Sequence, residues 1–420
     1  MNNNRKHLKD NQQINSESQS NLNNQIITNS PPEKDQEFES KRKNVSNKSQ
    51  QKEKKQKKER KFDFGKFHKR HIAFKLAYLG WKYQGFALNG PEDETTVEAH
   101  LFKALKKTCL VDDIKNANYT RSGRTDKGVS AFGQVICLDV RSNLSDGIGI
   151  LPVEENTTKI VRPKELEYIK MLNSVLPKDI KILSWSPVNI GYNARFNCKS
   201  RTYKYFFLKK NLDIELMNQS AQKFIGEHDF RNFCKIDPEK KHFNRRILEC
   251  SIEKVFSQET NGINSSSFEM YVFNIKGWAF LWHQIRMMVA ILFMIGNHQE
   301  KPEIIDYLFD VENVPLRPQY DMAPDNPLVL YDCEYDDLDF KSNTQETYRV
   351  FSSFNSIFEK LIFQSSMANS FSVFLNISEE EKALYSKERV HVPLKERKKC
   401  DPLKNSSFSL KTKSNQKTNF

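Results

Sequence analysis

The chain has 420 residues, 28% of them charged, and a formal net charge of +13 at pH 7. The positive charge belongs to the ends: residues 1–70 carry +9 and residues 390–420 carry +6, which leaves the body near −2. This excludes a uniformly basic body, so a polyanionic partner would need a locally basic site.

Cysteine spacing and hydropathy exclude further classes. The seven cysteines are an odd number and contain no C-x-x-C, which predicts reduced intracellular thiols and argues against a disulfide framework or zinc site. The most apolar run, Met287–Ile295, is far shorter than the roughly 20 residues of a membrane span, so no membrane association is expected. The polar N-terminus is not expected to act as a signal peptide.

The chain begins with a segment that predicts disorder. Residues 1–70 are rich in Asn, Gln, Ser, Lys and Glu and have almost no apolar periodicity. Within them, the run KEKKQKKERK (52–61) is either a nuclear-localisation or nucleic-acid patch or a solvated, self-repelling tail.

Strand and helix patterns follow in two similar series. In the first series, the alternation of apolar and polar residues predicts a strand over 71–78, and further strands are expected over 134–140 and 180–185. Two helices are expected between these strands. The first is capped by Thr95 or Thr96 and starts at Val97, and the second is opened by Pro163. Residues 143–162 between them are expected to form a surface insertion. In the second series we expect strands over 201–208, 247–256 and 267–275, and helices over 217–225, 282–295 and 302–309.

This rhythm predicts an α+β fold, an α/β sandwich of two lobes of mostly antiparallel sheet backed by helices, with an active-site cleft between them. The N-terminal lobe covers 71–190 and the C-terminal lobe 191–338. Apolar residues between 350 and 362 predict a docked helix within 339–389, and 390–420 forms a second basic tail.

The stretch YTRSGRTDKGVSAF (119–132) concentrates charge between apolar runs. Asp126 stands among Arg121, Arg124 and Lys127, and such neighbours should keep a carboxylate ionised. The cations favour a functional loop that faces an anion; the alternative is a turn aspartate that caps backbone N–H groups beside Gly128.

Two further positions carry candidate chemistry. Tyr203 and Tyr205 share one side of a strand and are either core residues or a ring that stacks on a base. Arg286 lies in an otherwise apolar helix, where a buried arginine requires a carboxylate partner, for which Asp126 is the candidate. The alternative is an arginine that extends to the surface. No phosphate-binding glycine loop or metal-ligand spacing occurs, so no cofactor or metal is expected.

Several of these motifs resemble the TruA-type tRNA pseudouridine synthases, over about residues 70–338. They are the loop SGRTDKGVSAFGQV (122–135) and the segments ARFNCKSRTYKYFF (194–207) and GWAFLWHQIRMMVAILFMIG (277–296). Segments 224–235, 300–310 and 327–335 are similar to the eukaryotic branch that modifies tRNA positions 38 and 39.

The resemblance implies a role for each candidate residue. Asp126 would be the catalytic carboxylate, Tyr203 would stack on the target uracil, and Arg286 would pair with Asp126. Arg124 would help displace the base, and Arg121 and Lys127 are expected to face the phosphate backbone.

The implied activity is isomerisation of uridine to pseudouridine in the anticodon stem-loop of tRNA, at positions 38 and/or 39, without a cofactor. A homodimer in the nucleus and/or cytoplasm is expected. The alternatives are a non-catalytic RNA-binding protein or RNA chaperone, which would explain the basic tails, and an RNA-processing hydrolase, for which metal ligands or a second paired carboxylate are missing.

Overall fold

A computed structural model describes residues 62–90, 93–153, 158–237, 242–258, 268–378, 380–381, 384 and 390–400. The predicted N-terminal tail, including the run 52–61, lies outside these residues up to position 61, and so does the C-terminal tail from 401.

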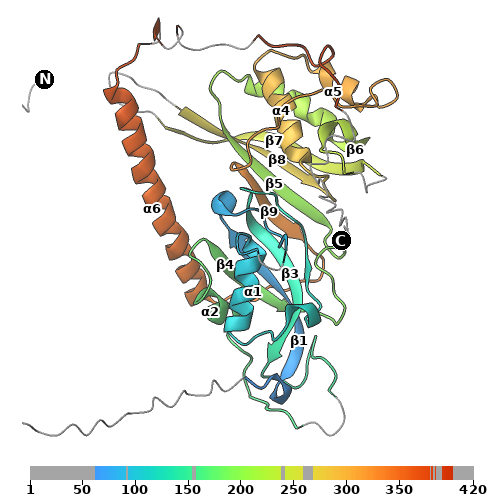
Figure 1. Cartoon of the computed structure of the whole chain (residues 1–420), viewed down its shortest axis with the longest axis vertical. Helices are drawn as coiled ribbons and strands as arrows, with labels where there is room; N and C mark the ends of the chain where they lie inside the picture. Colours follow the sequence, from blue (N-terminus) through green and yellow to red (C-terminus); the bar gives the residue numbers. More distant parts are fainter. Residues whose placement is uncertain are drawn as a thin grey trace, which may run out of the picture. The chain divides into compact units, whose positions relative to one another are not determined.

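One mixed sheet organises the described residues, with strand order β4–β1–β3–β9–β5–β8–β7–β6 and a short β2 paired to β3 (Figure 1). Every pairing is antiparallel except β3–β9. The strands are β1 (His68–Tyr78), β2 (Thr120–Arg121), β3 (Ser130–Ser142), β4 (Ile180–Pro187), β5 (Ser200–Leu208), β6 (Gly226–Asp229), β7 (Asn244–Gln258), β8 (Phe268–Gly277) and β9 (Leu328–Glu334).

The sheet has two halves, each with its own hydrophobic core. One core gathers side chains around β1, β3 and β4, and the other gathers side chains around β5, β7 and β8. β9 joins the halves, because it pairs with β3 on one side and β5 on the other. Tyr203 on β5 packs against both cores. The α+β fold is confirmed, and the candidate residues lie where the halves meet.

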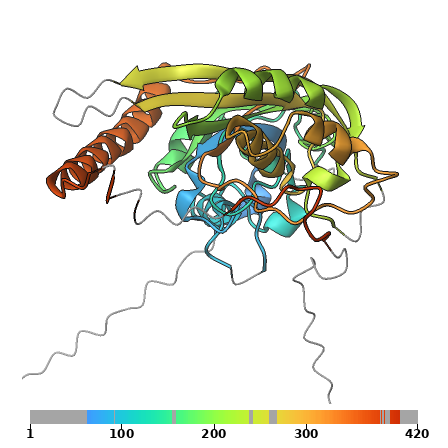
Figure 2. The same cartoon turned by 90° about the horizontal axis from the view of Figure 1, so that it is seen from above.

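Six helices accompany the sheet in the described residues. They are α1 (Val97–Lys107), α2 (Tyr168–Asn173), α3 (Ile214–Ala221), α4 (Gln284–Gly296), α5 (Glu303–Phe309) and α6 (Thr344–Phe374). Helices α1 and α4 lie on the same side of the sheet (Figures 1 and 2). The predicted cap of α1 is confirmed, since Thr96 Oγ1 accepts a hydrogen bond from Ala99 N at 3.4 Å.

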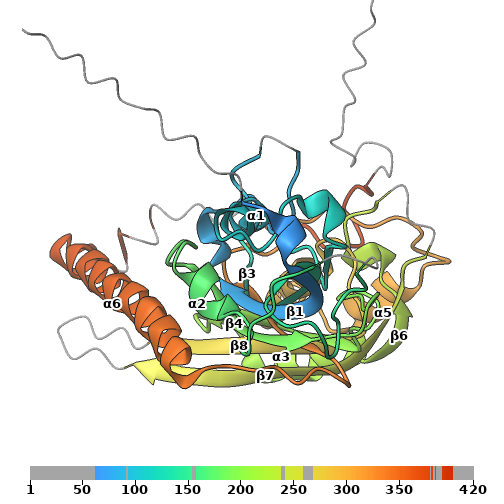
Figure 3. The ribbon, with the colours of Figure 1, turned by 90° about the horizontal axis from the view of Figure 1, so that it is seen from below.

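Two predicted helices differ from the structure in their bounds. α2 begins five residues after Pro163 and lies beside β4 (Figure 3). Asn173 at its end fixes it there, because its side chain accepts from Ile182 N at 2.8 Å and donates to Ile182 O at 2.9 Å. The helix predicted over 217–225 begins three residues earlier, as α3 at Ile214, and its last part, Gln222–Phe224, is a 3-10 turn before Gly226, with φ of +110°, starts strand β6.

The expected insertion 143–162 is attached to the sheet. Gly149 O accepts a hydrogen bond from His71 N of β1 at 2.7 Å. Gly149 has φ of +80°, and a Cβ atom there would lie 2.4 Å from His71 O, so only glycine allows this approach. Residues 154–157 of the insertion lie outside the described part.

Helix α6 forms as predicted, but its docking is limited to its first turns. Ser353 Oγ donates to Lys178 O at 3.0 Å, next to β4. Phe351, Phe358 and Ile362 on the predicted apolar face stay exposed. The periodicity therefore indicated the helix correctly but not what covers it. Among the described residues, no helix combines the length and hydropathy that a bilayer span requires.

Candidate active site

The charged loop joins β2 to β3 at the centre of the sheet and is held in one conformation. Ser122 Oγ donates to Gln134 Oε1 at 2.5 Å across the loop. Gly128 has φ of +78°, and a Cβ atom there would lie 2.7 Å from Asp325 Oδ1, so a larger residue would displace the turn. Asp126 is thereby presented on a fixed turn.

Asp126 is largely buried, with 28% of its side chain exposed. Burial raises the pKa of Asp126 to about 6; the charge of Arg286 and a hydrogen bond from the Trp282 indole oppose this rise, and Asp325 adds to it. Desolvation therefore outweighs the neighbouring cations in setting the pKa of Asp126. A carboxyl group with a pKa near 6 is still about nine-tenths ionised at pH 7. It is also a stronger base than an ordinary aspartate.

Arg286 lies in the first turn of α4 and is 8% exposed. Its Nε donates to Ala323 O at 2.7 Å. Its charge is the largest influence that lowers the pKa of Asp126, as its predicted pairing requires. Among the described residues, however, no Arg286 nitrogen lies within 4.0 Å of a carboxylate oxygen, so its effect on Asp126 acts through space.

His283, the residue directly before α4, also approaches Asp126. Its Nε2 lies 3.6 Å from Asp126 Oδ2, and its Nδ1 is buried without a hydrogen-bond partner in the described residues. Burial and the charges of Arg286 and Lys235 lower the pKa of His283 to about 4, so the imidazole is neutral at pH 7. His283 has φ of +62°, a backbone conformation unusual for a residue other than glycine and often found at functional sites.

Tyr203 reaches the same region from β5. It is half-buried, and its ring contacts Phe280 edge-on with a centroid distance of 5.1 Å. Burial raises the pKa of Tyr203, and the charge of Asp126 contributes to this, so the two side chains share one environment. The sequence prediction that Tyr203 and Asp126 lie together agrees with this placement.

The loop cations separate into two kinds. Arg124 and Lys127 are exposed, and within the described part of the chain neither side chain has an ion pair or hydrogen bond, so both are free to meet an anion. Arg121 instead pairs with buried Glu98, with Nη1 2.5 Å from Oε1. Arg121 is therefore held by an ion pair that Arg124 and Lys127 lack, and its contact with a phosphate backbone stays a prediction.

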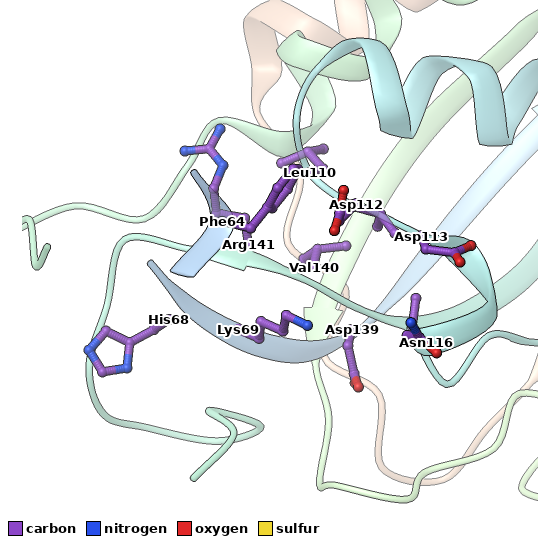
Figure 4. A pocket seen from close by; sticks show the side chains of 12 residues that line it. Phe64, His68, Lys69, Leu110, Asp112, Asp113, Asn116, Asp139, Val140 and Arg141 are labelled. Carbon is purple, nitrogen blue, oxygen red and sulfur yellow. The ribbon is translucent and has the colours of Figure 1, made fainter. Parts of the chain in front are cut away.

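No metal centre accompanies these residues in the described ranges, where no three His, Cys, Asp or Glu side chains gather with ligand geometry. A small pocket of about 60 Å³ lies elsewhere, between β1, β3 and the segment 110–117 (Figure 4). It is lined by Lys69, Asp112, Asp139 and their neighbours and contains none of the six predicted site residues.

Comparison with known proteins identifies the family. Residues 220–336 match the family model described as tRNA pseudouridine synthase. The tRNA pseudouridine(38/39) synthase of Saccharomyces cerevisiae is 41% identical over 320 residues, 74% of this chain and 68% of the yeast protein. The tRNA pseudouridine synthase A of Thermococcus sibiricus is 30% identical over 300 residues, 70% of this chain and 96% of the relative. The chain belongs to the tRNA pseudouridine synthase family.

The match spans less than two thirds of the mammalian relatives. The tRNA pseudouridine(38/39) synthase of Homo sapiens is 47% identical over 279 residues, 66% of this chain, and the match spans 58% of the human protein. The segment 220–336 of the family match includes Arg286 but not Asp126 or Tyr203.

Three residues of this candidate site were missed from the sequence: His283, Trp282 and Asp325. One signal was present for His283, which stands three residues before Arg286. Residues at this spacing share one side of a helix, so the predicted approach of Arg286 to Asp126 should have included His283. Asp325 has no such signal, because it reaches the site from the loop before β9.

Proposed function

We propose that the chain converts uridine to pseudouridine in tRNA, at position 38 and/or 39 of the anticodon stem-loop. The observation that carries this proposal is the buried carboxylate of Asp126, which shares its surroundings with Tyr203 and the Arg286 charge. The names of the yeast and human relatives supply the positions. Conversion of a tRNA transcript by the purified chain, with loss on replacing Asp126, tests it.

The chemistry needs a charged carboxylate and no net hydrolysis. The bond from uracil N1 to ribose C1′ breaks, the base turns, and C5 bonds to C1′; the proton from C5 is lost and N1 is protonated. Asp126 can add to the base, attack the sugar carbon, or remove a proton in an elimination. Tyr203 receives the uracil after it leaves its stack, which costs a few kcal/mol. Arg124 stands exposed on the loop, where it can hold the displaced nucleotide.

The raised pKa of Asp126 predicts the pH dependence of activity. We expect single-turnover rates to fall as the pH drops through about 6, because protonation removes the reactive carboxylate. His283 does not titrate in this range, since its pKa is lowered to about 4. Rates of pseudouridine formation between pH 5 and 8, with tRNA saturating, measure this decrease. A midpoint near 4, the value of an unperturbed aspartate, would contradict the assignment.

We also propose a homodimer, with the exposed apolar side of α6 as part of the contact. On one side of this helix, Phe351, Phe358 and Ile362 remain exposed. Apolar side chains left in water at this spacing are typical of protein–protein contacts. It supports an interface, although nothing in the described residues covers it.

Charged substitutions on α6 are expected to shift the chain from dimer to monomer. Glu at both Phe351 and Phe358 places charges on the predicted contact, and sedimentation velocity measures the result. The matched control is Ser356→Glu, since Ser356 is exposed on the opposite side of the helix. A wild-type monomer at micromolar concentration, or a dimer unaffected by the paired substitution, would refute the proposal.

Residence in the nucleus and/or cytoplasm is proposed from the basic run 52–61, which lies outside the described residues. Lys/Arg-rich runs of this length are typical of nuclear import signals and RNA contacts. Microscopy of a fluorescent fusion, with and without glutamine at the lysines of this run, tests import. An unchanged nuclear fraction would leave the run without that role.

A further inference from the structure

Three exposed aromatic rings near the loop each lie beside a cation. Their exposed fractions are 42% for Trp282, 53% for Trp278 and 80% for Phe196. The cations lie over the rings at 4.3 Å for Lys235 on Trp282, 5.1 Å for Arg246 on Trp278 and 5.7 Å for Arg195 on Phe196. We call these six residues the aromatic–cation platform.

Buried Arg201 connects two of these pairs to the catalytic loop. Its guanidinium donates to Ser122 O at 2.8 Å, to Trp278 O at 2.7 Å and to Arg195 O at 3.2 Å. The main chains that carry Trp278 and Phe196 are therefore bound to one side chain. The same side chain holds the loop at Ser122, four residues before Asp126.

The third pair lies directly at Asp126. Lys235 N donates to Trp282 O at 2.9 Å, which fixes the segment beneath the ring. Trp282 is followed directly by His283, whose Nε2 lies 3.6 Å from the Asp126 carboxylate. The platform is thus continuous with the candidate active site.

The charge of the platform selects the kind of ligand. Among the described residues, none of Lys235, Arg195 and Arg246 has a carboxylate oxygen within 4.0 Å. Large rings left in water beside unneutralised cations suit a ligand that is both anionic and flat. Unpaired nucleotides meet both conditions, because every base has a stacking face and every linkage carries a charge.

We propose that the aromatic–cation platform binds unpaired nucleotides that flank the target uridine, with bases stacked on Trp278 and Phe196. This inference rests on the proposed function, because it takes the RNA loop to be the substrate. It adds to that function a second contact outside the carboxylate pocket. Loop nucleotides held there would keep the target base at Asp126 after it leaves the stack.

The test measures the dissociation constant of a synthetic anticodon stem-loop RNA for the full chain. Trp278→Ala and Phe196→Ala are each expected to raise it by roughly 5- to 150-fold, the range that loss of one base–aromatic stack implies. Trp278→Phe should restore most of the affinity, because a stacking ring remains. Arg246→Gln should weaken binding and lower the dependence of affinity on salt by about one counterion.

The matched control is Tyr331→Ala. Tyr331 is also exposed and carries Lys204 at 4.2 Å over its ring, but it points to the opposite side of the sheet from Leu330, the neighbour of Tyr203. Its replacement should leave the dissociation constant unchanged. Equal losses for Tyr331→Ala and Trp278→Ala would overturn the proposal, since the effect would then not be specific to the platform.

The outcomes separate this inference from the proposed function. Weak binding by Trp278→Ala together with a wild-type chain that forms no pseudouridine would support the platform and refute the function. Normal RNA binding by Trp278→Ala and Phe196→Ala would overturn the platform, whatever the wild-type activity. If those variants instead changed only the oligomeric state, the platform would be a protein contact and the inference would fail.

Discussion

Asn in place of Asp126 is expected to reduce pseudouridine formation by on the order of 10⁴-fold or more, because the amide can neither accept the proton nor act as the nucleophile. The change preserves the shape of the side chain on its fixed turn. Binding of tRNA should therefore stay within about tenfold, roughly 1.4 kcal/mol. Single-turnover kinetics and a binding isotherm on the same preparation measure both effects.

The same substitution should stabilise the fold at pH 7. The pKa of Asp126 is raised in the folded chain, so folding favours the protonated form, and this contribution is lost as the pH rises from about 4 through 6. Asn removes the cost of the buried charge, and we expect the free energy of unfolding at pH 7 to rise by about 1–3 kcal/mol.

Loss of tRNA binding with normal turnover of the bound fraction would refute the catalytic assignment of Asp126.

Replacement of Arg286 with Met is expected to produce the second largest loss, about 10²- to 10³-fold in rate at pH 7. Met fills similar space but removes the charge that most lowers the pKa of Asp126. The pH at which the rate falls on the acidic side of the profile should then move above 6. Ala323 O also loses its donor, so the free energy of unfolding should fall by about 1–3 kcal/mol.

Arg286→Lys is the control for this prediction, because it keeps the positive charge and changes the geometry. The pH at which the rate of Arg286→Lys falls should stay closer to the wild-type value than that of Arg286→Met. If both variants lost activity equally and the pH dependence of their rates matched that of the wild type, Arg286 would act only through its hydrogen bond to Ala323 O. Its assigned effect on Asp126 would then be wrong.

Local pattern was enough to predict the elements and the central residues. Alternation predicted β1, runs of apolar and aromatic residues predicted β3, β5 and β8, and helical spacing predicted α1 and α4. The cost of a buried arginine connected Arg286 to Asp126 across 160 positions of sequence, and in the structure the charge of Arg286 lowers the pKa of Asp126 without a direct ion pair. That inference needed only the chemistry of one side chain.

Quantities that depend on burial by distant segments could not be predicted in this way. The pKa of Asp126 depends on how much water the surrounding elements exclude, and a list of nearby cations in the sequence does not contain that information. Arg121 resembles Arg124 in the sequence, yet Glu98 on α1 pairs with it and leaves Arg124 free. The apolar periodicity of α6 indicates a helix but not whether a partner covers its apolar side.

Pseudouridine mapping on a single tRNA tests the central claim most directly. An unmodified transcript is incubated with the wild-type chain or with Asp126→Asn, and every uridine is assayed by pseudouridine-specific chemistry. We expect conversion at position 38 and/or 39 by the wild type and none by Asp126→Asn. Binding without conversion at any position by the wild type, or equal conversion by both proteins, would contradict an isomerase whose reactive carboxylate is Asp126.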